Sequence, residues 1–582
     1  MPPAAPPPAP SPPPSAGLSL PGGPPPVPQP GDAGAGPRTA PRRSALLPRA
    51  GRSARIAVIG AGPAGLTSAK QALAEGHEVV VYERNADVGG VWDPGSGGAY
   101  PGVRMQHSRM SLPFSDFPPE RVADFPTLPQ VHAYLRAYAE RFGVLARCRF
   151  GHRVARVARR AGGGWRVTAE RDGHAPATEE FDAVLVAVGE LWEPRLPDRM
   201  PGPGAAVRVW TAKSYRGPEG FAGRRTLVVG GGVSGADIAA ELSDAGARVD
   251  WSLRTRPLFL PRDCGGVYND ALFSYAGRIA LEELPYRDYL EWLGDLLPEY
   301  MAMYRETGLL PRKGFHGAVH INDKVIPRVY RGRIRPRPAF GGFTPDGAAV
   351  LTDGTTRTER SYDDVVLCLG YAAPDHGFIE DFRPEDLYGH HVHRRDPTLA
   401  VIGVPAGAEG FGAACPYVEA VAGWVLAVLG GRAELPDAAG RAAWCERTAA
   451  GSAARAGERA HLDCWLETVR MGLAAGTLPD PHTRFAAYWR LVSGTVAPSR
   501  LRPEGPAVPR PAAFDGLVDL DHVRHRILAA LPLTDRDTLL ATAEIGREDY
   551  EAALSVPPGR ELPPWLPYRR WRASRPPAAV PG

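Results

Sequence analysis

Strand–helix–strand units recur along this chain and are visible in its pattern of apolar and polar positions. Two apolar runs, "RIAVIG" from Arg55 and "TLVVGG" from Thr226, have the length and composition of buried strands. Each is followed by a segment with the apolar spacing of a helix and then by a second strand, "HEVVVYER" or "ARVDWSL". Strands that alternate with helices predict an α/β fold with parallel sheets. We therefore expect two Rossmann-like dinucleotide-binding domains.

The first unit carries the glycine pattern of a dinucleotide-binding turn. Gly60, Gly62 and Gly65 complete G-x-G-x-x-G between strand and helix, where glycines allow a tight turn and the close approach of a pyrophosphate. Glu83 ends the second strand, near the position about 20 residues on where a carboxylate binds ribose hydroxyls. Because this carboxylate would repel a 2′-phosphate, the site predicts FAD or NAD rather than NADP. The candidate cofactor-binding residues, which extend into "NADVGGVW", are Gly60, Gly62, Pro63, Ala64, Gly65, Glu83, Arg84, Gly90, Val91 and Trp92.

The second unit repeats the glycine pattern but ends its second strand differently. No acid stands at the end of that strand, and arginines are found there instead. Because guanidinium groups form paired, charge-assisted hydrogen bonds with phosphates, this site predicts NADPH rather than NADH. Together the two sites predict a permanently held flavin and a nicotinamide that reduces it. The candidate residues of the second site are Gly230, Gly232, Ser234, Gly235, Ala236, Asp237, Ser252, Arg254 and Arg256.

The order of these motifs resembles the flavin-containing monooxygenase family, the class B flavoprotein monooxygenases. "VIGAGPAGL", "YERNADVGGVW", "FSDFP", "LVVGGGVSGADIA" and "VVLCLGY" follow the family's order over roughly residues 55–431. The resemblance implies a FAD domain interrupted by an NADPH domain, with a linker like the family's A-T-G-Y ending at Gly370 and Tyr371. The expected segments are 1–54, a disordered Pro/Ala-rich N-terminus; 55–206, the first part of the FAD domain; 207–329, the NADPH domain; 330–431, the second FAD part; and 432–582, a mainly helical extension.

The resemblance also implies a reaction. NADPH would reduce FAD, and the reduced flavin would form a C4a-hydroperoxide with O2 that oxygenates an amine nitrogen or sulfide sulfur of a small molecule. Gln106 or His107 stands in for the family's asparagine beside the flavin. Of the family motif F-x-G-x-x-x-H-x-x-x-Y/W only Tyr215 survives, with Thr211 at the histidine position. The family's N/S-oxidising members carry tyrosine there, whereas its Baeyer–Villiger members carry tryptophan. The candidate catalytic residues are thus Gln106, His107 and Tyr215.

Several alternatives stay open at this level. The chain resembles flavoproteins broadly enough for a Baeyer–Villiger monooxygenase, and the degenerate stretch 205–215 leaves room for an NADPH reductase, an oxidase or a redox-dependent binding module without oxygenation. A dithiol reductase needs a redox-active cysteine pair, and the six cysteines form no C-x-x-C. His107 has an equally good explanation as an ordinary half-buried histidine.

Composition narrows the partners and the compartment. A net charge of +4 over 582 residues gives no reason to expect nucleic acid. Scattered cysteines predict reduced thiols and, with no signal peptide, a cytoplasmic protein. No apolar run reaches the roughly 18 residues of a membrane span, so "VEAVAGWVLAVLGG" from Val418 is expected to be a buried helix ended by Gly430 and Gly431.

The remaining segments predict helices but not their roles. An apolar stripe in the insert 264–320 fits either a substrate channel or, more often, core. His316 and His320 are spaced i,i+4, but Gly317 and the lack of a third ligand argue against a metal site. Amphipathic helices are expected from Asp519 and from Leu533. The extension to which they belong would cap the active site or form a homodimer face.

Overall fold

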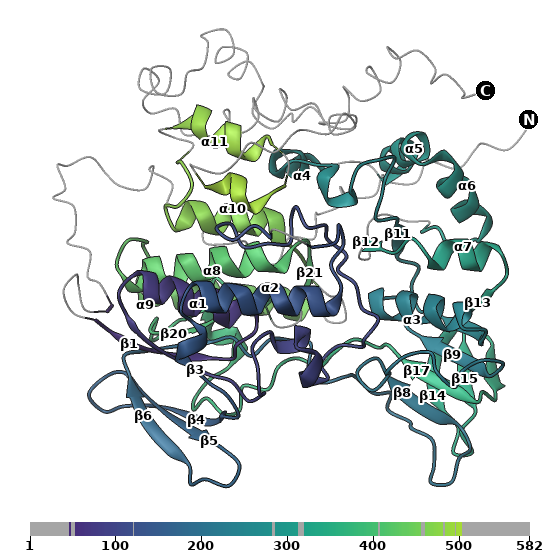
Figure 1. The fold of residues 1–582 in the computed structure, drawn as a ribbon, viewed down its shortest axis with the longest axis horizontal. Coiled ribbons are helices and arrows are strands. Elements are labelled where there is room, and N and C mark those ends of the chain that lie inside the picture. Colours follow the sequence, from purple (N-terminus) through teal and green to yellow (C-terminus); the bar gives the residue numbers. More distant parts are fainter. Residues whose placement is uncertain are drawn as a thin grey trace, which may run out of the picture.

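Two sheets, one mainly parallel and one wholly parallel, lie at the centres of two domains that stand side by side, with helices above them (Figure 1). This confirms the expected α/β fold with two dinucleotide-binding domains. The computed structural model describes residues 46–47, 53–119, 122–281, 286–311, 319–405, 408–454, 460–480, 484–494 and 496–502. The helices predicted from Asp519 and Leu533, and nearly all of segment 1–54, lie outside these ranges.

The first sheet has seven strands in the order β18-β19-β20-β7-β1-β2-β3. The apolar run that begins at Arg55 forms β1, which is parallel to β2 on one side and to β7 on the other. Helix α1 connects β1 with β2, as the alternating pattern requires. The bounds are β1 Arg55–Ile59, α1 Pro63–Ala74, β2 Glu78–Tyr82, β3 Cys148–Arg149, β7 Ala183–Val186, β18 Leu387–Tyr388, β19 Val392–His393 and β20 Leu399–Val401.

The second sheet has five parallel strands in the order β13-β10-β9-β17-β8. Helix α3 connects β9 with β10 in the same way that α1 connects β1 with β2. The bounds are β8 Arg208–Thr211, β9 Arg225–Val229, α3 Val233–Asp244, β10 Arg248–Ser252, β13 Ile334–Arg337 and β17 Asp364–Leu367.

In both domains the chain then leaves the parallel sheet to form a separate antiparallel sheet, which we call the antiparallel excursion. After its β-α-β unit each chain segment forms a three-stranded antiparallel sheet, and returns as a parallel strand beside the first strand of its own domain. That returning strand is β7 in the first domain and β17 in the second. The excursion sheets are β4 (Arg153–Arg159), β5 (Trp165–Glu170) and β6 (Ala177–Phe181), and β14 (Ala339–Phe343), β15 (Ala349–Thr352) and β16 (Arg357–Arg360).

This shared plan corrects one expected boundary. The sequence predicts that segment 330–431 forms the second part of the FAD domain. Instead β13 pairs with β10, and β17 lies between β9 and β8, so the second domain continues to about Leu367. The chain rejoins the first sheet only at β18–β20.

Helices complete the packing. In the first domain α1, α2 (Leu128–Arg141) and α8 (Ala414–Leu429) cover one face of the sheet, and α8 is capped by Gly430, as the sequence indicates. The predicted helical insert 264–320 forms α4 (Tyr275–Leu281), α5 (Tyr286–Leu296) and α6 (Pro298–Glu306), and α7 (Val325–Tyr330) follows it. Its aromatic stripe belongs to the core of the second domain, as Tyr289, Trp292 and Tyr304 show. His320 lies on strand β12 (Val319–Ile321) rather than on a helix, and His316 is outside the described residues.

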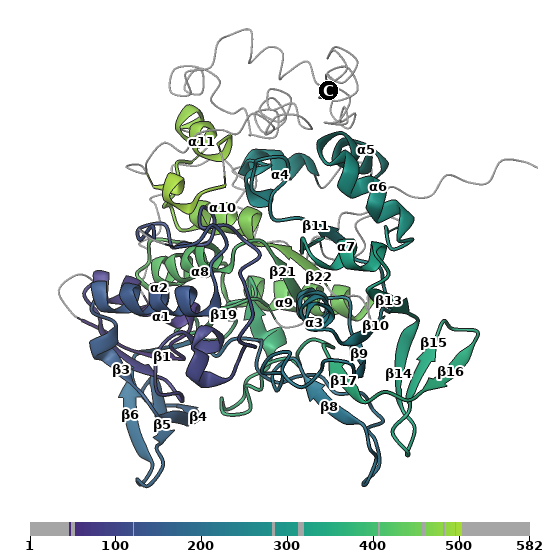
Figure 2. The same ribbon diagram turned by 45° about the vertical axis from the view of Figure 1, so that its right-hand side comes forward.

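The described part of the C-terminal extension contains α9 (Ala438–Ala454), β22 (Ala460–Asp463), α10 (Cys464–Ala474) and α11 (Phe485–Val492), and β22 pairs with β21 (Ala408–Phe411). Helices α10 and α11 lie above the first domain (Figure 2), whereas α9 packs beside β18 at the edge of the first sheet. Helix α10 packs on α8 and reaches α4. All six cysteines are free thiols. Among the described residues no helix is both long and apolar enough to span a bilayer.

Candidate functional site

A cavity of about 740 Å³ opens at the carboxyl ends of β1, β2 and β7. This is the edge of an open parallel sheet where nucleotides bind, and the volume is in the range of cofactor sites. Nine of the ten residues expected from the first fingerprint line it: Gly60, Gly62, Pro63, Ala64, Glu83, Arg84, Gly90, Val91 and Trp92. The tenth, Gly65, lies below the turn against Gly60.

The turn tolerates only glycine at its key positions. Gly60 has φ +106°, and a Cβ there would lie 2.4 Å from the carbonyl oxygen of Ala187. A Cβ on Gly65 would lie 1.8 Å from the carbonyl oxygen of Gly60. Gly90, with φ +60°, passes so close to Gly62 that its Cβ would be 3.1 Å from that residue's Cα. These contacts form a backbone cradle at the start of α1, where helix N–H groups attract a pyrophosphate.

Glu83 is fixed at the rim of this cradle. Its side chain is buried, and its two oxygens accept hydrogen bonds from the backbone N–H groups of Ala61 (2.7 Å) and Asn85 (2.8 Å). A carboxylate has further lone pairs, which remain for two ribose hydroxyls. The residues present therefore fit FAD: glycines for the pyrophosphate and a pre-oriented carboxylate for the ribose.

Two further groups in this cavity were not expected. Trp192 lines it and lies under the guanidinium of Arg84, 4.3 Å from the ring centroid. Glu190 also lines it, and burial raises the pKa of its carboxyl to about 6. Both follow β7 in "VAVGELW", a stretch that lies outside the two fingerprints. The glycine after that strand was the available signal.

The second fingerprint has the same backbone geometry. Gly230 has φ +119°, and its Cβ would lie 2.2 Å from the carbonyl oxygen of Cys368. A Cβ on Gly235 would lie 2.1 Å from the carbonyl oxygen of Gly230. Gly232 has nothing within 4 Å of its Cβ direction, so the backbone is open to a phosphate there. Ser234 and Ala236 lie in the first turn of α3.

The candidate ligands after β10 divide into two kinds. Arg254 and Arg256 are exposed, and within the described chain neither makes an ion pair. They are thus available to a 2′-phosphate at the end of the strand. Ser252 is buried, and its hydroxyl donates to the carbonyl oxygen of Pro338 (2.7 Å), so it holds the β10–β13 edge instead.

Asp237 lies between the two domains and away from the phosphate turn. Its carboxylate accepts from the hydroxyl of Tyr100 in the first domain (3.0 Å) and from the amide of Asn322 (2.6 Å). Burial raises the pKa of Asp237. The residue therefore links α3 to the FAD domain, a role that its place in the fingerprint does not reveal.

Tyr215 reinforces this interface. Its hydroxyl donates to Glu241 on α3 (2.9 Å), and its ring meets Tyr100 edge-to-face with centroids 6.4 Å apart. The hydroxyl is thus committed to α3, which makes Tyr215 a positioning residue rather than a group at the reacting atoms. Together Tyr100 and Tyr215 supply contacts between the domains, although the motif's histidine is Thr211 here.

Gln106 and His107 lie where the first domain meets the insert, outside the lining of the 740 Å³ cavity. The amide oxygen of Gln106 accepts from the N–H of Ile321 on β12 (3.3 Å). His107 is half-buried beside Trp465 of the extension, with ring centroids 5.4 Å apart. Burial lowers the pKa of His107; Asp270 opposes this effect and Arg278 adds to it.

The predicted linker residues Gly370 and Tyr371 lie just before a part of the chain that lines the cavity. Gly370 has φ +80° and Tyr371 bridges to Pro194, and the chain just after them, at Ala372, lines the cavity.

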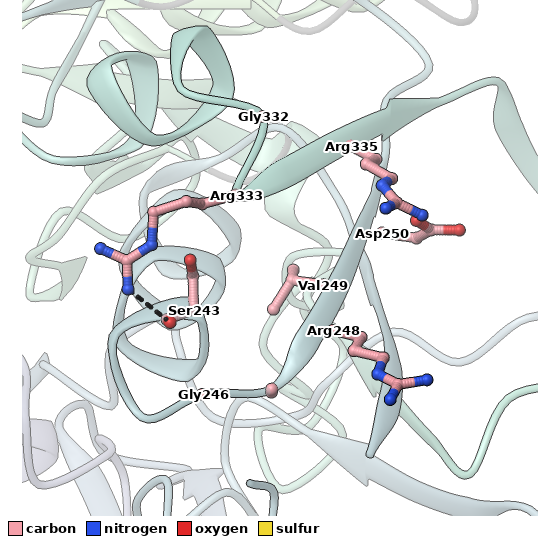
Figure 3. A pocket seen from close by; sticks show the side chains of 9 residues that line it. Ser243, Gly246, Arg248, Val249, Asp250, Gly332, Arg333 and Arg335 are labelled. Atoms are coloured by element: carbon pink, nitrogen blue, oxygen red, sulfur yellow. Dashed lines mark hydrogen bonds between the residues drawn. The ribbon is translucent and has the colours of Figure 1, made fainter. Parts of the chain in front are cut away.

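A separate hollow of about 310 Å³ lies between the end of α3 and the starts of β10 and β13 (Figure 3). There Arg333 donates to the carbonyl oxygen of Ser243 (3.1 Å). Because this hollow is at the opposite end of the strands from the fingerprint, it is not part of the candidate site.

One cradle closed by a carboxylate and a second open to arginines define a flavoprotein oxidoreductase in which NADPH reduces FAD. Comparison with known proteins identifies the family: residues 53–447 match the model of the flavin-binding monooxygenase-like family, to which this chain belongs. The protein is an NADPH-dependent, FAD-containing monooxygenase.

Individual relatives agree with this assignment. Flavin-containing monooxygenase 5 of Rattus norvegicus is 30% identical over 533 residues, which cover 84% of this chain and 96% of the relative. Dimethylaniline monooxygenase [N-oxide-forming] 2 of Mus musculus is 32% identical over 411 residues, or 66% and 74% of the two chains. The fold is similar to that of S-allyl-L-cysteine S-oxygenase from Allium sativum, with a TM-score of 0.53, 21% identity and coverage of 73% and 89%.

Proposed function

We propose that this monooxygenase transfers one oxygen atom of O2 to a soft nucleophile, an amine nitrogen or a sulfide sulfur, of a small molecule. The observation that carries this substrate class is Tyr215, which occupies the motif position that distinguishes N/S-oxidising from Baeyer–Villiger members. Its hydroxyl is bonded to Glu241, so the tyrosine is integrated in the interface. A relative named for N-oxide formation supports the same class.

The proposed division of labour assigns binding to the chain and redox chemistry to the cofactors. FAD, reduced by NADPH, supplies the oxygen activation when bound. The glycine cradle and Glu83 hold FAD, and the α3 turn with Arg254 and Arg256 holds NADPH. Tyr100 bonds to Asp237 on α3 and so fixes the second fingerprint against the first domain.

Gln106 and His107 are proposed to guard the reacting end. Gln106 is anchored to β12 through Ile321, so its amide N–H group remains for the cofactors. Because burial lowers the pKa of His107, its imidazole is neutral at pH 7 and has one unprotonated ring nitrogen. We infer that this nitrogen accepts the proton that an ammonium substrate must lose before its nitrogen becomes nucleophilic.

Product stoichiometry tests this function. Holoenzyme is supplied with NADPH, O2 and one of three probes, methyl phenyl sulfide, N,N-dimethylaniline or cyclohexanone. The proposal expects sulfoxide and N-oxide in amounts close to the NADPH consumed. Lactone formed from cyclohexanone without sulfoxide or N-oxide would indicate a Baeyer–Villiger enzyme. Hydrogen peroxide as the sole product with all three probes would indicate an oxidase or reductase.

A further inference from the structure

The C-terminal extension contacts His107, one of the candidate catalytic residues, through the first turn of α10. Trp465 is only 3% exposed, and its ring meets the imidazole of His107 edge-to-face at 84°. The family match ends at residue 447, so this tryptophan comes from beyond the region that the family model describes. We propose that Trp465 forms a wall of the oxygenation site and determines how large a group beside the reacting atom is admitted, an inference that rests on the proposed function.

An ion pair from the insert holds this wall in place. Oδ1 of Asp463 caps α10 by accepting from the N–H groups of Trp465 (3.0 Å) and Leu466 (3.1 Å). Its Oδ2 accepts from Nε of Arg278 on α4 (2.7 Å). The guanidinium of Arg278 lies over the indole, 4.2 Å from a ring centroid. The same carboxylate therefore fixes the helix start and the cation that covers the ring.

The backbone of Gly412 also lies close to the indole. A Cβ on Gly412, which has φ +106°, would lie 3.0 Å from indole carbons of Trp465. Arg278 and Gly412 thus both pack against the tryptophan, which is 3% exposed. A side chain held in this way acts as a fixed wall.

Helix α10 also joins the two hydrophobic cores. Cys464 and Met471 belong to the core of the first domain, whereas Trp465 and Val469 belong to that of the second. In both views α10 lies between α8 below and α4 beside it (Figures 1 and 2). The extension therefore completes the junction at which His107 lies.

The His107 side of the junction is equally anchored. Asp270 of the insert accepts from the N–H of Ser108 (2.6 Å) and from the hydroxyl of Ser111. Its other oxygen is buried and has no hydrogen-bond partner within the described residues. The imidazole of His107 and the indole of Trp465 thus form a surface of two flat rings. It suits a substrate whose nitrogen or sulfur carries a flat apolar group of limited size.

Binding of two sulfides of different size tests the wall without turnover. Dimethyl sulfide and methyl 2-naphthyl sulfide are titrated into oxidised holoenzyme, without NADPH, and binding is followed by the perturbation of flavin absorbance. In Trp465→Ala the larger probe should gain at least about tenfold in affinity relative to the smaller one, the scale on which pocket size discriminates substrates. Trp465→Phe should stay near the wild-type ratio. Trp489→Ala is the control, because Trp489 stacks on Phe485 within α11, away from His107.

An unchanged affinity ratio in Trp465→Ala would overturn the wall. The same would follow if Trp489→Ala shifted the ratio equally, because the effect would then be a loosening of the extension. Trp465→Leu serves if the alanine variant loses its flavin. Turnover of the wild-type holoenzyme with NADPH and O2 separates this proposal from the proposed function. If sulfoxide forms but the affinity ratio does not change in Trp465→Ala, only the wall is rejected. If the enzyme releases only peroxide but the affinity ratio does change, the proposed N/S-oxygenation is rejected and the wall is kept.

Discussion

The two dinucleotide sites of this protein share a turn but differ in what surrounds it. Gly60 and Gly230 both have positive φ, and both lie under a carbonyl oxygen at the end of the strand that returns from the antiparallel excursion. The first turn faces a cavity whose rim carries the buried Glu83. The second precedes a strand that ends in the exposed Arg254 and Arg256.

This difference shows that backbone and side chains determine separate properties. The turn geometry fixes where a pyrophosphate lies, and it is the same in both domains. The group at the end of the second strand determines which dinucleotide fits. A buried carboxylate suits the ribose hydroxyls of FAD, whereas exposed arginines suit the 2′-phosphate of NADPH.

The largest expected effect removes the first site alone. In Gly65→Ala the new methyl group would collide with the carbonyl oxygen of Gly60, only 1.8 Å from where an ideal Cβ would stand, so α1 must shift away from β1. We expect purified protein with essentially no bound flavin, measured as the ratio of flavin to protein absorbance. Gly162→Ala is the control, because nothing lies within 4 Å of its Cβ direction. Normal flavin content in Gly65→Ala would refute the cradle.

The matching change in the second domain should separate the two sites. Gly235→Ala meets the carbonyl oxygen of Gly230 at 2.1 Å, so NADPH binding is lost while FAD remains. Anaerobic reduction of the flavin by NADPH should slow by about a hundredfold, equivalent to roughly 2.7 kcal/mol. Dithionite should still reduce the flavin fully. If Gly235→Ala loses bound FAD as well as flavin reduction by NADPH, the two sites are not independent.

The arginines should control the choice of nicotinamide. Replacing both Arg254 and Arg256 by alanine removes charge-assisted hydrogen bonds to the 2′-phosphate, so the KM for NADPH should increase by about 10- to 100-fold. The KM for NADH, which lacks that phosphate, should change little. Arg248→Ala is the matched control, since Arg248 is exposed at the far end of the same strand. Equal losses for both nicotinamides would contradict the assignment.

The smallest expected effect is a pH dependence of the free energy of unfolding that arises from Glu190 at the first site. Burial raises the pKa of Glu190 from 4.5 to about 6, so the folded chain binds this proton more tightly than the unfolded chain does. The free energy of unfolding should therefore decrease as pH rises from about 4.5 to about 6, by roughly 2 kcal/mol from this group. Glu190→Gln should flatten that slope in flavin-free protein, followed by denaturant unfolding. An unchanged slope, matching that of Glu193→Gln, would exclude Glu190 as the titrating group.

The sequence predicts features that depend on spacing within one segment, but not features that depend on contacts between distant segments. The glycine turns, Glu83 and helix α8 depend on spacing within one segment, so the apolar pattern and the fingerprints predict them. The place of β17 depends on the antiparallel excursion, which repeats in both domains, and the recurrence of "VAVG" and "LCLG" was its signal.

Other features had no local signal. Asp237 has a place in the fingerprint, but its partners Tyr100 and Asn322 are far away along the chain. Trp465 and Asp270 reach His107 from two other segments, and no motif relates these three residues. Contacts of this kind come from the packing of domains, which a single sequence does not encode as spacing.

Rapid mixing of the reduced enzyme with O2 tests the central account most directly. Holoenzyme is reduced with one equivalent of NADPH under anaerobic conditions and then mixed with oxygenated buffer, with or without methyl phenyl sulfide. The account predicts that the oxidised flavin band returns slowly without the sulfide, and that sulfoxide forms in proportion to the NADPH used when it is present. Immediate return of that band with one equivalent of hydrogen peroxide, whether or not sulfide is present, would contradict it.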